Sequence, residues 1–185
     1  MVRTTRRALL ALLALIVFVA VAGGVYAWQV RPDLDSRRDA ATEAWDALRP
    51  ALDERYLVLT AATDTVREEG GRPRAVVRDL DVALATWRDA REAGDDVIGE
   101  VRIANDLEGL TRRLVRTVTD TPRLASNEAV TAVMEQLAST PVPAAAADYA
   151  DAVRAYESER QGTVRELFAE LLGFDSLPTL DPSAS

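Results

Sequence analysis

The 185-residue sequence contains no cysteine, no histidine and no lysine, and all 22 of its basic residues are arginine. Without cysteine there is no disulfide framework and no thiol chemistry, and without histidine the commonest general base and metal ligand is missing. These absences exclude most zinc sites and the usual Ser-His and Cys-His hydrolases. The lack of lysine also excludes Schiff-base chemistry and Walker-type phosphate loops. We therefore expect no catalytic residues, no metal site and no cofactor.

Aromatic residues make up only 5% of the chain, whereas 48% of the residues are hydrophobic, many of them alanine. This composition favours closely packed helices over a sheet, and no stretch alternates polar and apolar residues with a period of two. The net charge is −8, but residues 1–28 carry three arginines and no acid. The remainder therefore holds 19 arginines against 30 acids, a balance that opposes binding to nucleic acid.

Residues 8–28 form the one long apolar run, with no charged side chain in twenty-one positions. A helix of this length spans the hydrocarbon core of a bilayer, about 30 Å thick. Arginines precede the run within residues 1–7, and Tyr26 and Trp28 stand at its far end, where such rings favour the interface. The sequence thus predicts a single transmembrane anchor in contact with the lipid bilayer. The alternative is a cleavable signal peptide, for which residues 20–22 and 25–27 supply small residues at suitable spacing.

The basic residues around the anchor bear on its orientation. Arg3, Arg6 and Arg7 before the run place the N-terminus in the cytoplasm and the rest of the chain outside it. Three arginines, at positions 31, 37 and 38, follow the run and nearly balance this signal. We expect a single-pass protein of the cell membrane with its helices on the extracytoplasmic side.

Apolar residues recur with helical spacing beyond the anchor. They predict helices over about 34–69, about 74–93, from 97 to just before Pro122, and from the cap Asn127 to 171 with an interruption at Pro141 and Pro143. Pro32 should break or kink the chain, and Pro50 should kink the first of these helices. Short links between amphipathic helices predict an all-α fold, an antiparallel (up-down) four-helix bundle over 34–174, with an N-terminal transmembrane helix and an irregular tail over 175–185.

Several motifs in this region resemble the LemA family of bacterial membrane-anchored helical proteins. The first bundle helix carries an Arg-Tyr pair, the second an Ala-Arg pair, a Pro-x-Leu turn precedes the last helix, and two tyrosines seven residues apart precede a closing Gly-Phe. The positions are Arg55, Tyr56, Ala90, Arg91, Pro122, Tyr149, Tyr156, Gly173 and Phe174. The chain departs from the pattern at Leu57, Thr60, Ala150 and Glu157, where the family has polar residues or proline. The resemblance implies a helical fold and membrane anchoring, but no general biochemical activity.

Some side chains have two readings. Tyr56, Tyr149 and Tyr156 could line a ligand groove, but their spacing favours core positions with hydroxyls at the surface. Arg160 continues the apolar stripe and should pair with a carboxylate of the first or second helix, or reach solvent, rather than bind an anion.

The surface of the predicted bundle also offers two alternatives. Arg112, Arg113 and Arg116 form a candidate surface for an acidic partner or anionic lipid, against a simple solvated face. A second membrane contact near the end of the last helix competes with ordinary core packing for a set of apolar residues. They are Leu167, Phe168, Leu171, Leu172 and Phe174.

The sequence as a whole predicts a membrane-tethered, non-enzymatic helical module for interactions with an unknown protein partner or with the envelope. The alternative is a sensory ectodomain that binds a small ligand between its helices. An enzyme ranks third, because nothing in the sequence marks paired carboxylates for acid–base work.

Overall fold

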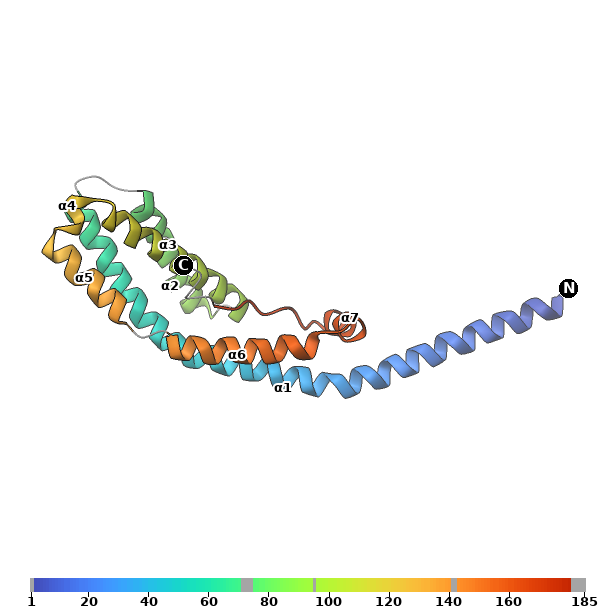
Figure 1. Ribbon diagram of the computed structural model, residues 1–185. Helices are drawn as coiled ribbons and strands as arrows, with labels where there is room; N and C mark the ends of the chain where they lie inside the picture. The colour runs from blue at the N-terminus through green and yellow to red at the C-terminus, as the bar shows by residue number, and fades with distance from the viewer. Residues whose placement is uncertain (1, 71–74, 95, 141–142, 181–185) are drawn as a thin grey trace. The chain divides into compact units, whose positions relative to one another are not determined.

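The computed structural model describes the backbone of residues 2–70, 75–94, 96–140 and 143–180, and their side chains apart from those of residues 2–27, 29, 30, 143, 144, 163 and 164. The described residues form helices without any strand, which confirms the all-α prediction. The helices are α1 (Val2–Gly70), α2 (Ala75–Ala93), α3 (Val97–Thr119), α4 (Pro122–Ala125), α5 (Glu128–Ser139), α6 (Pro143–Arg160) and α7 (Thr163–Leu171) (Figure 1).

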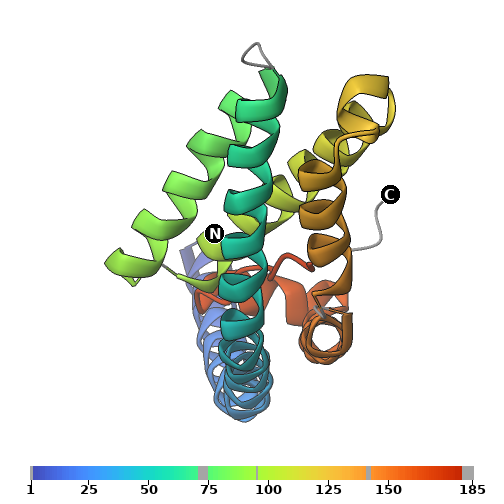
Figure 2. The same ribbon diagram turned by 90° about the vertical axis from the view of Figure 1, so that its left-hand side faces the viewer.

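The chain divides into two compact units, which we describe separately. The first unit consists of residues 1–39 and 155–176 and holds the early part of α1, the end of α6, and α7. The second unit consists of residues 40–154 and 177–185 and holds the later part of α1, helices α2 to α5 and most of α6. Within the second unit, α1 lies between α2 and α5 (Figure 2).

The apolar stripe of α1 is buried as its spacing predicts. Residues at intervals of three, four and seven recur on one face of a helix, and that face packs against the other helices. Each of the following is at most 3% exposed: Leu34, Ala41, Trp45, Leu48, Leu52, Tyr56, Leu59 and Val66. The matching stripe of α2 is buried at Val77, Leu80, Leu84 and Trp87.

The two prolines of α1 do not interrupt it. The helix runs through Pro32 and Pro50, so the break expected at Pro32 is wrong. Both prolines are exposed. On the solvent side, water can bond the carbonyl that loses its helical N–H, so proline costs the helix less there than it would in the core. The buried stripe on the opposite face holds the helix together.

The ends of α2, α3 and α5 follow the expected signals. Gly94, just after α2, has φ of +69°, a left-handed conformation that glycine adopts without strain. Asp96 caps α3 by accepting from the Gly99 N–H at 2.7 Å. Asn127 caps α5 by accepting from the Val130 N–H at 3.1 Å. Each cap satisfies one of the N–H groups that a helix start leaves unpaired.

The last predicted helix, from Asn127 to 171, is three helices. α5 ends at Ser139 and α6 begins at Pro143, as the predicted interruption requires, but α6 then ends at Arg160 and α7 begins at Thr163. Between them Gly162 has φ of +119°, a conformation that L side chains rarely adopt and that a helix cannot contain. The expectation overlooked this glycine because the apolar spacing continues past it.

The segment after α7 is irregular, as predicted over the described residues 175–180, but it is well packed. In the second unit, Leu177 and Leu180 are 5% and 3% exposed. The Tyr149 hydroxyl donates to the Pro178 carbonyl at 2.8 Å, and the Asn105 side-chain amide donates to the Thr179 carbonyl at 2.9 Å. Polar side chains of α3 and α6 thus fix an extended segment through its backbone.

In the part of the chain whose side chains are described, no helix is long and apolar enough to cross a membrane. The predicted anchor over 8–28 lies outside those side chains except at Trp28, which is 80% exposed. The anchor therefore stays a prediction.

Candidate functional site

Arg55 and Glu108 form a buried ion pair between α1 and α3. Arg55 donates from Nε to Oε1 at 2.7 Å and from Nη2 to Oε2 at 2.8 Å, the two-pronged geometry that suits a guanidinium and a carboxylate. The Glu108 side chain is 4% exposed and that of Arg55 is 16% exposed. The hydrogen bond to Glu108 raises the pKa of Arg55 above its ordinary value. The remaining nitrogen of Arg55, Nη1, donates to the Leu137 carbonyl of α5 at 3.1 Å.

Glu100 is the second buried carboxylate, with no exposed surface. Its Oε2 accepts from Trp45 Nε1 at 2.5 Å and from Arg49 Nε at 2.7 Å, both on α1. Its Oε1 accepts from Arg91 Nη1 of α2 at 3.4 Å. A buried charge is tolerated when it is paired and hydrogen-bonded, and this one has three donors from two helices.

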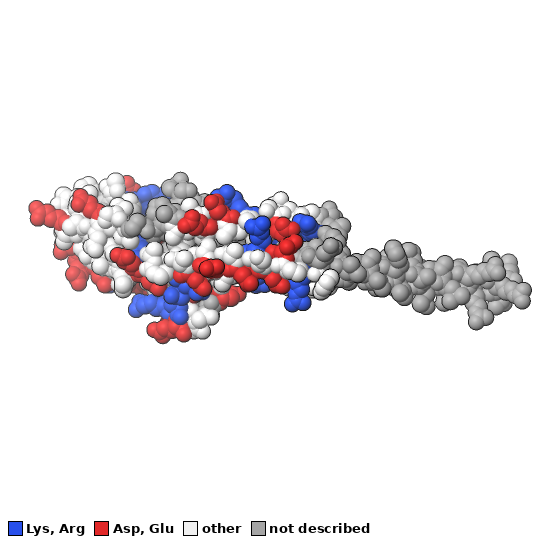
Figure 3. All heavy atoms as spheres, turned by 90° about the horizontal axis from the view of Figure 1, so that it is seen from below, with Lys and Arg blue, Asp and Glu red and all other residues white. Residues whose placement is uncertain are grey.

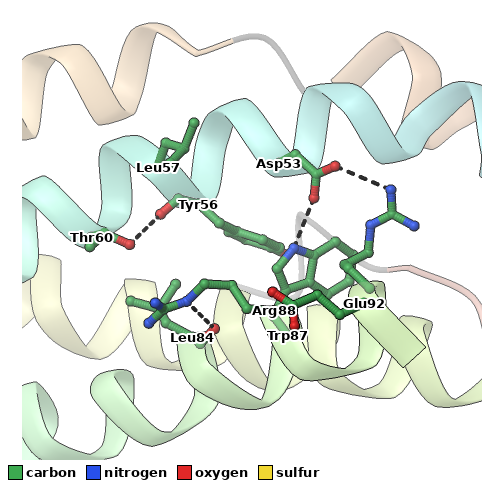
Figure 4. Close-up of a pocket in the computed structure, with 9 residues that line it drawn as sticks. Asp53, Tyr56, Leu57, Thr60, Leu84, Trp87, Arg88 and Glu92 are labelled. Atoms are coloured by element: carbon green, nitrogen blue, oxygen red, sulfur yellow. Dashed lines mark hydrogen bonds and ion pairs between the residues drawn. The ribbon is translucent and has the colours of Figure 1, made fainter. Parts of the chain in front are cut away.

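A pocket of ≈ 290 Å³ opens beside this network, between α1 and α2. Its apolar wall is formed by Tyr56, Leu57, Leu84 and Trp87. Around them lie the polar residues Asp53, Thr60, Arg88, Arg91 and Glu92. Figure 4 shows the Trp87 ring beside Tyr56, and the two rings meet edge to face at 5.1 Å between centroids.

Asp53 bonds both Trp87 of the pocket wall and Arg91, which also bonds Glu100. It accepts from Trp87 Nε1 at 3.0 Å and from Arg91 Nη2 at 3.3 Å (Figure 4). Arg91, whose guanidinium carbon lies 6.0 Å from the centroid of the Trp87 ring, thus bridges Asp53 and Glu100. The pocket has a rigid aromatic wall and a charged rim.

The three motif tyrosines are core residues, each at most 3% exposed. The expectation that their hydroxyls reach the surface is wrong, because each donates to a backbone carbonyl. Tyr56 donates to Ala104 at 3.4 Å, Tyr149 to Pro178 at 2.8 Å and Tyr156 to Asp175 at 2.8 Å. Burial raises the pKa of all three phenols, most clearly at Tyr56 and Tyr149, so they remain neutral donors. Tyr56 also lines the pocket, and whether that pocket binds a ligand stays a prediction.

The remaining motif positions shape the backbone. Pro122 is the first residue of α4, where its missing N–H removes no helical bond, and Ala90 is buried at 4% exposure on α2. Gly173 has φ of +79° after α7, and the Phe174 N–H donates to the Ala169 carbonyl at 2.8 Å. With the Gly173 N–H bonded to the Glu170 carbonyl at 3.1 Å, this is the Schellman ending of a helix. Phe174 is 4% exposed.

The arginines singled out in the sequence differ in their pairing and exposure. Arg160 pairs with Glu157 of its own helix at 2.7 Å, not with a carboxylate of the first or second helix, and lies over the Tyr156 ring. Arg113 pairs with Asp79 of α2 at 2.8 Å, whereas Arg112 is half-buried and Arg116 is exposed. Whether Arg112, Arg113 and Arg116 bind a partner stays a prediction.

The sequence analysis missed the two buried glutamates. Glu100 falls in the first turn of α3, where acids are common, and Glu108 belongs to no motif, so neither was singled out. A signal was present, because both occur on the apolar stripe of α3 with Ala104 and Thr111, at intervals of four, four and three. An acid on a buried face needs a buried cation, and the motif arginines Arg55 and Arg91 were the candidates.

Among the residues the structure describes, no group of three or more acidic side chains is arranged to hold a metal ion. A family model described as the LemA family matches residues 44–184. No curated protein and no solved structure matches the chain. The matched region contains the whole Arg–Glu network, the pocket and the docked segment after α7.

Proposed function

Because this chain belongs to the LemA family, we propose that it is a non-enzymatic helical module that residues 8–28 tether to a membrane and that binds a protein or envelope partner. In this proposal the helices after the anchor keep an up-down, four-helix arrangement and lie on the extracytoplasmic side. The observation that supports this proposal is that the buried polar side chains are bonded to other groups of the protein. Glu100 and Glu108 are held by arginines, and the motif tyrosines are held by carbonyls.

This arrangement argues against acid–base catalysis by the motif residues. The carboxylate oxygens of Glu100 and Glu108 already accept hydrogen bonds from arginine side chains, so they have no free position for a substrate proton. The surface supports an interaction role, because it carries exposed apolar side chains. They include Leu57 of α1, Val82 of α2 and Val115 of α3, which are 72%, 68% and 43% exposed.

Val82 also lines a shallow groove of ≈ 470 Å³ between α2 and α3. The walls of this groove are mainly apolar, with Asp79 and Asp106 at its sides. Acidic side chains are spread over the face drawn in Figure 3, with arginines among them. Together with the net charge of −8, this favours a protein partner over nucleic acid.

Photo-crosslinking in intact cells tests the proposal. A photoreactive residue at position 82 should give a discrete protein adduct, whereas the same residue at the exposed position 135 of α5 should not. Protease digestion of the intact cells would report the side of the membrane. The absence of any adduct from positions 57, 82 and 115 would overturn the proposed binding of a partner. Substrate turnover that a single carboxylate substitution abolishes would overturn the proposed non-enzymatic role.

A second function is favoured by the α1–α2 pocket, which suits a small amphipathic ligand. Its volume is at the lower end of the range for ligand sites, about 300–1,000 Å³. Thr60 lines the pocket and Thr65 does not, yet both hydroxyls bond the carbonyl four residues earlier in α1. A compound that raises the unfolding temperature of the wild type and of Thr65→Phe, but not of Thr60→Phe, would establish this binding function.

A further inference from the structure

An apolar face of α7 remains uncovered in the first unit. Leu167 and Leu171, one helical turn apart, are 65% and 78% exposed, although Ala169 and Phe174 beside them are buried. Core packing, the simpler expectation for these leucines, is therefore wrong for both of them. Two exposed leucines at a spacing of four make a continuous apolar strip on the helix.

Arg38 ties the end of α7 to α1. Arg38 Nη1 donates to the carbonyl of Gly173, just after α7, at 3.4 Å. Tyr156, near the end of α6, donates from its hydroxyl to the Asp175 carbonyl at 2.8 Å, so the end of α6 lies beside the chain that leaves α7. Leu34 is completely buried, which places the core of this unit one turn before Arg38.

The chain approaches the predicted membrane surface before it turns into α7. Within the first unit the end of α6 runs opposite to α1, so the chain returns toward the anchor end of α1 before it enters α7 (Figure 1). α6 ends at Arg160, about one turn past Tyr156, and the chain then turns at Gly162 into α7. Leu34, one turn before Arg38, is six residues past Trp28, about 9 Å along a helix. The headgroup region on each side of a bilayer is about 5–8 Å deep.

We infer that α7 lies on the lipid surface from which α1 emerges, with Leu167 and Leu171 inserted at the headgroup boundary. The inference rests on the proposed anchor. Trp28, 80% exposed at the end of the apolar run, belongs to the same compact unit and suits the same interface. Exposed Glu166 and Glu170 beside the leucines disfavour an anionic surface, so the fitting lipid is zwitterionic. An amphipathic helix of this kind binds in the plane of the interface.

The absence of cysteine makes a site-specific test simple, because any introduced cysteine is the only one. The full chain is reconstituted into phosphatidylcholine vesicles containing a doxyl-labelled quencher lipid, with an environment-sensitive fluorophore at one of three positions. Leu171→Cys reports on α7. Phe18→Cys reports on the anchor. Leu57→Cys is the matched control, since Leu57 is 72% exposed but belongs to the second unit.

The expected result is quenching at positions 18 and 171 and none at 57. Quenching at 18 without quenching at 171 overturns the α7 contact and leaves the anchor standing. A chain that does not float with the vesicles, and is not quenched at 18, overturns both. Blue-shifted emission at 171 that the quencher lipid does not reduce means that protein covers the leucines, and overturns the lipid assignment.

A second variant separates contact from folding. Leu167→Ser/Leu171→Ser replaces only exposed side chains, so the circular dichroism and unfolding curve in detergent should be unchanged. In vesicles, a fluorophore at the exposed position 170 should then lose its quenching. Unchanged quenching at 170 in this variant would show that the leucines do not hold α7 on the lipid.

Discussion

Removal of one partner of the Arg55–Glu108 pair should destabilise the second unit far more than removal of both. Arg55→Met leaves the Glu108 carboxylate, only 4% exposed, without its two charge-assisted hydrogen bonds. Breaking a buried pair in this way costs about 3–5 kcal/mol. That is a large part of the stability of a typical domain, about 5–15 kcal/mol.

The double variant Arg55→Met/Glu108→Met should recover most of this loss, because it removes both desolvated charges and keeps similar volumes. The Leu137 carbonyl would lose its bond from Arg55 Nη1, which prevents full recovery. Urea unfolding of the full chain in detergent, followed by circular dichroism, gives the four free energies of the double-mutant cycle.

The exposed pair Arg67–Asp81 is the matched control, with side chains 39% and 49% exposed. Its coupling energy in the same cycle should not exceed about 1 kcal/mol. Additive effects at Arg55 and Glu108, with a coupling no larger than that control, would refute the reasoning that the buried pair acts as a unit.

Four further outcomes follow from features described above. Tyr149→Phe loses the bond to the Pro178 carbonyl, which should cost about 0.5–1.5 kcal/mol and increase hydrogen exchange around residues 177–180. Burial raises the pKa of Tyr149 and Tyr156, so the unfolded chain releases their protons first. Their contribution to stability should be constant below about pH 10 and fall above it, by at most about 1.4 kcal/mol per pH unit for each tyrosine, in urea titrations across that range. Asn127→Ala should cost about 1 kcal/mol in the same assay, because the cap of α5 is lost. Gly162→Ala should cost about 1–3 kcal/mol through its positive φ, and a value near zero would show that the turn after α6 adapts.

The buried faces of the helices were predictable because local spacing determines them. The α1 residues that recur at intervals of three, four and seven are buried, and so are the four of the α2 stripe. The cap at Asn127 was predictable from its side-chain chemistry alone. Family membership was predictable too, since the motif order survives in the sequence and the family model matches residues 44–184.

The pairings between helices were not predictable from spacing. Arg55 and Glu108 are 53 positions apart, and only the register of α1 against α3 brings them together. The turn at Gly162 was missed because apolar periodicity carries no information on backbone φ. The pocket depends on how Tyr56 and Trp87 meet across two helices, which the sequence does not specify.

The three tryptophans make the chain its own set of spectroscopic probes. Trp45 and Trp87 lie inside the second unit, and each indole N–H donates to a carboxylate, of Glu100 and Asp53 respectively. Trp28 is exposed in the first unit. Emission from Trp45 and Trp87 should therefore change when the Arg–Glu network opens, and emission from Trp28 should change with the solvent around the end of the apolar run. Single-tryptophan variants would thus follow folding and membrane attachment separately, without any added label.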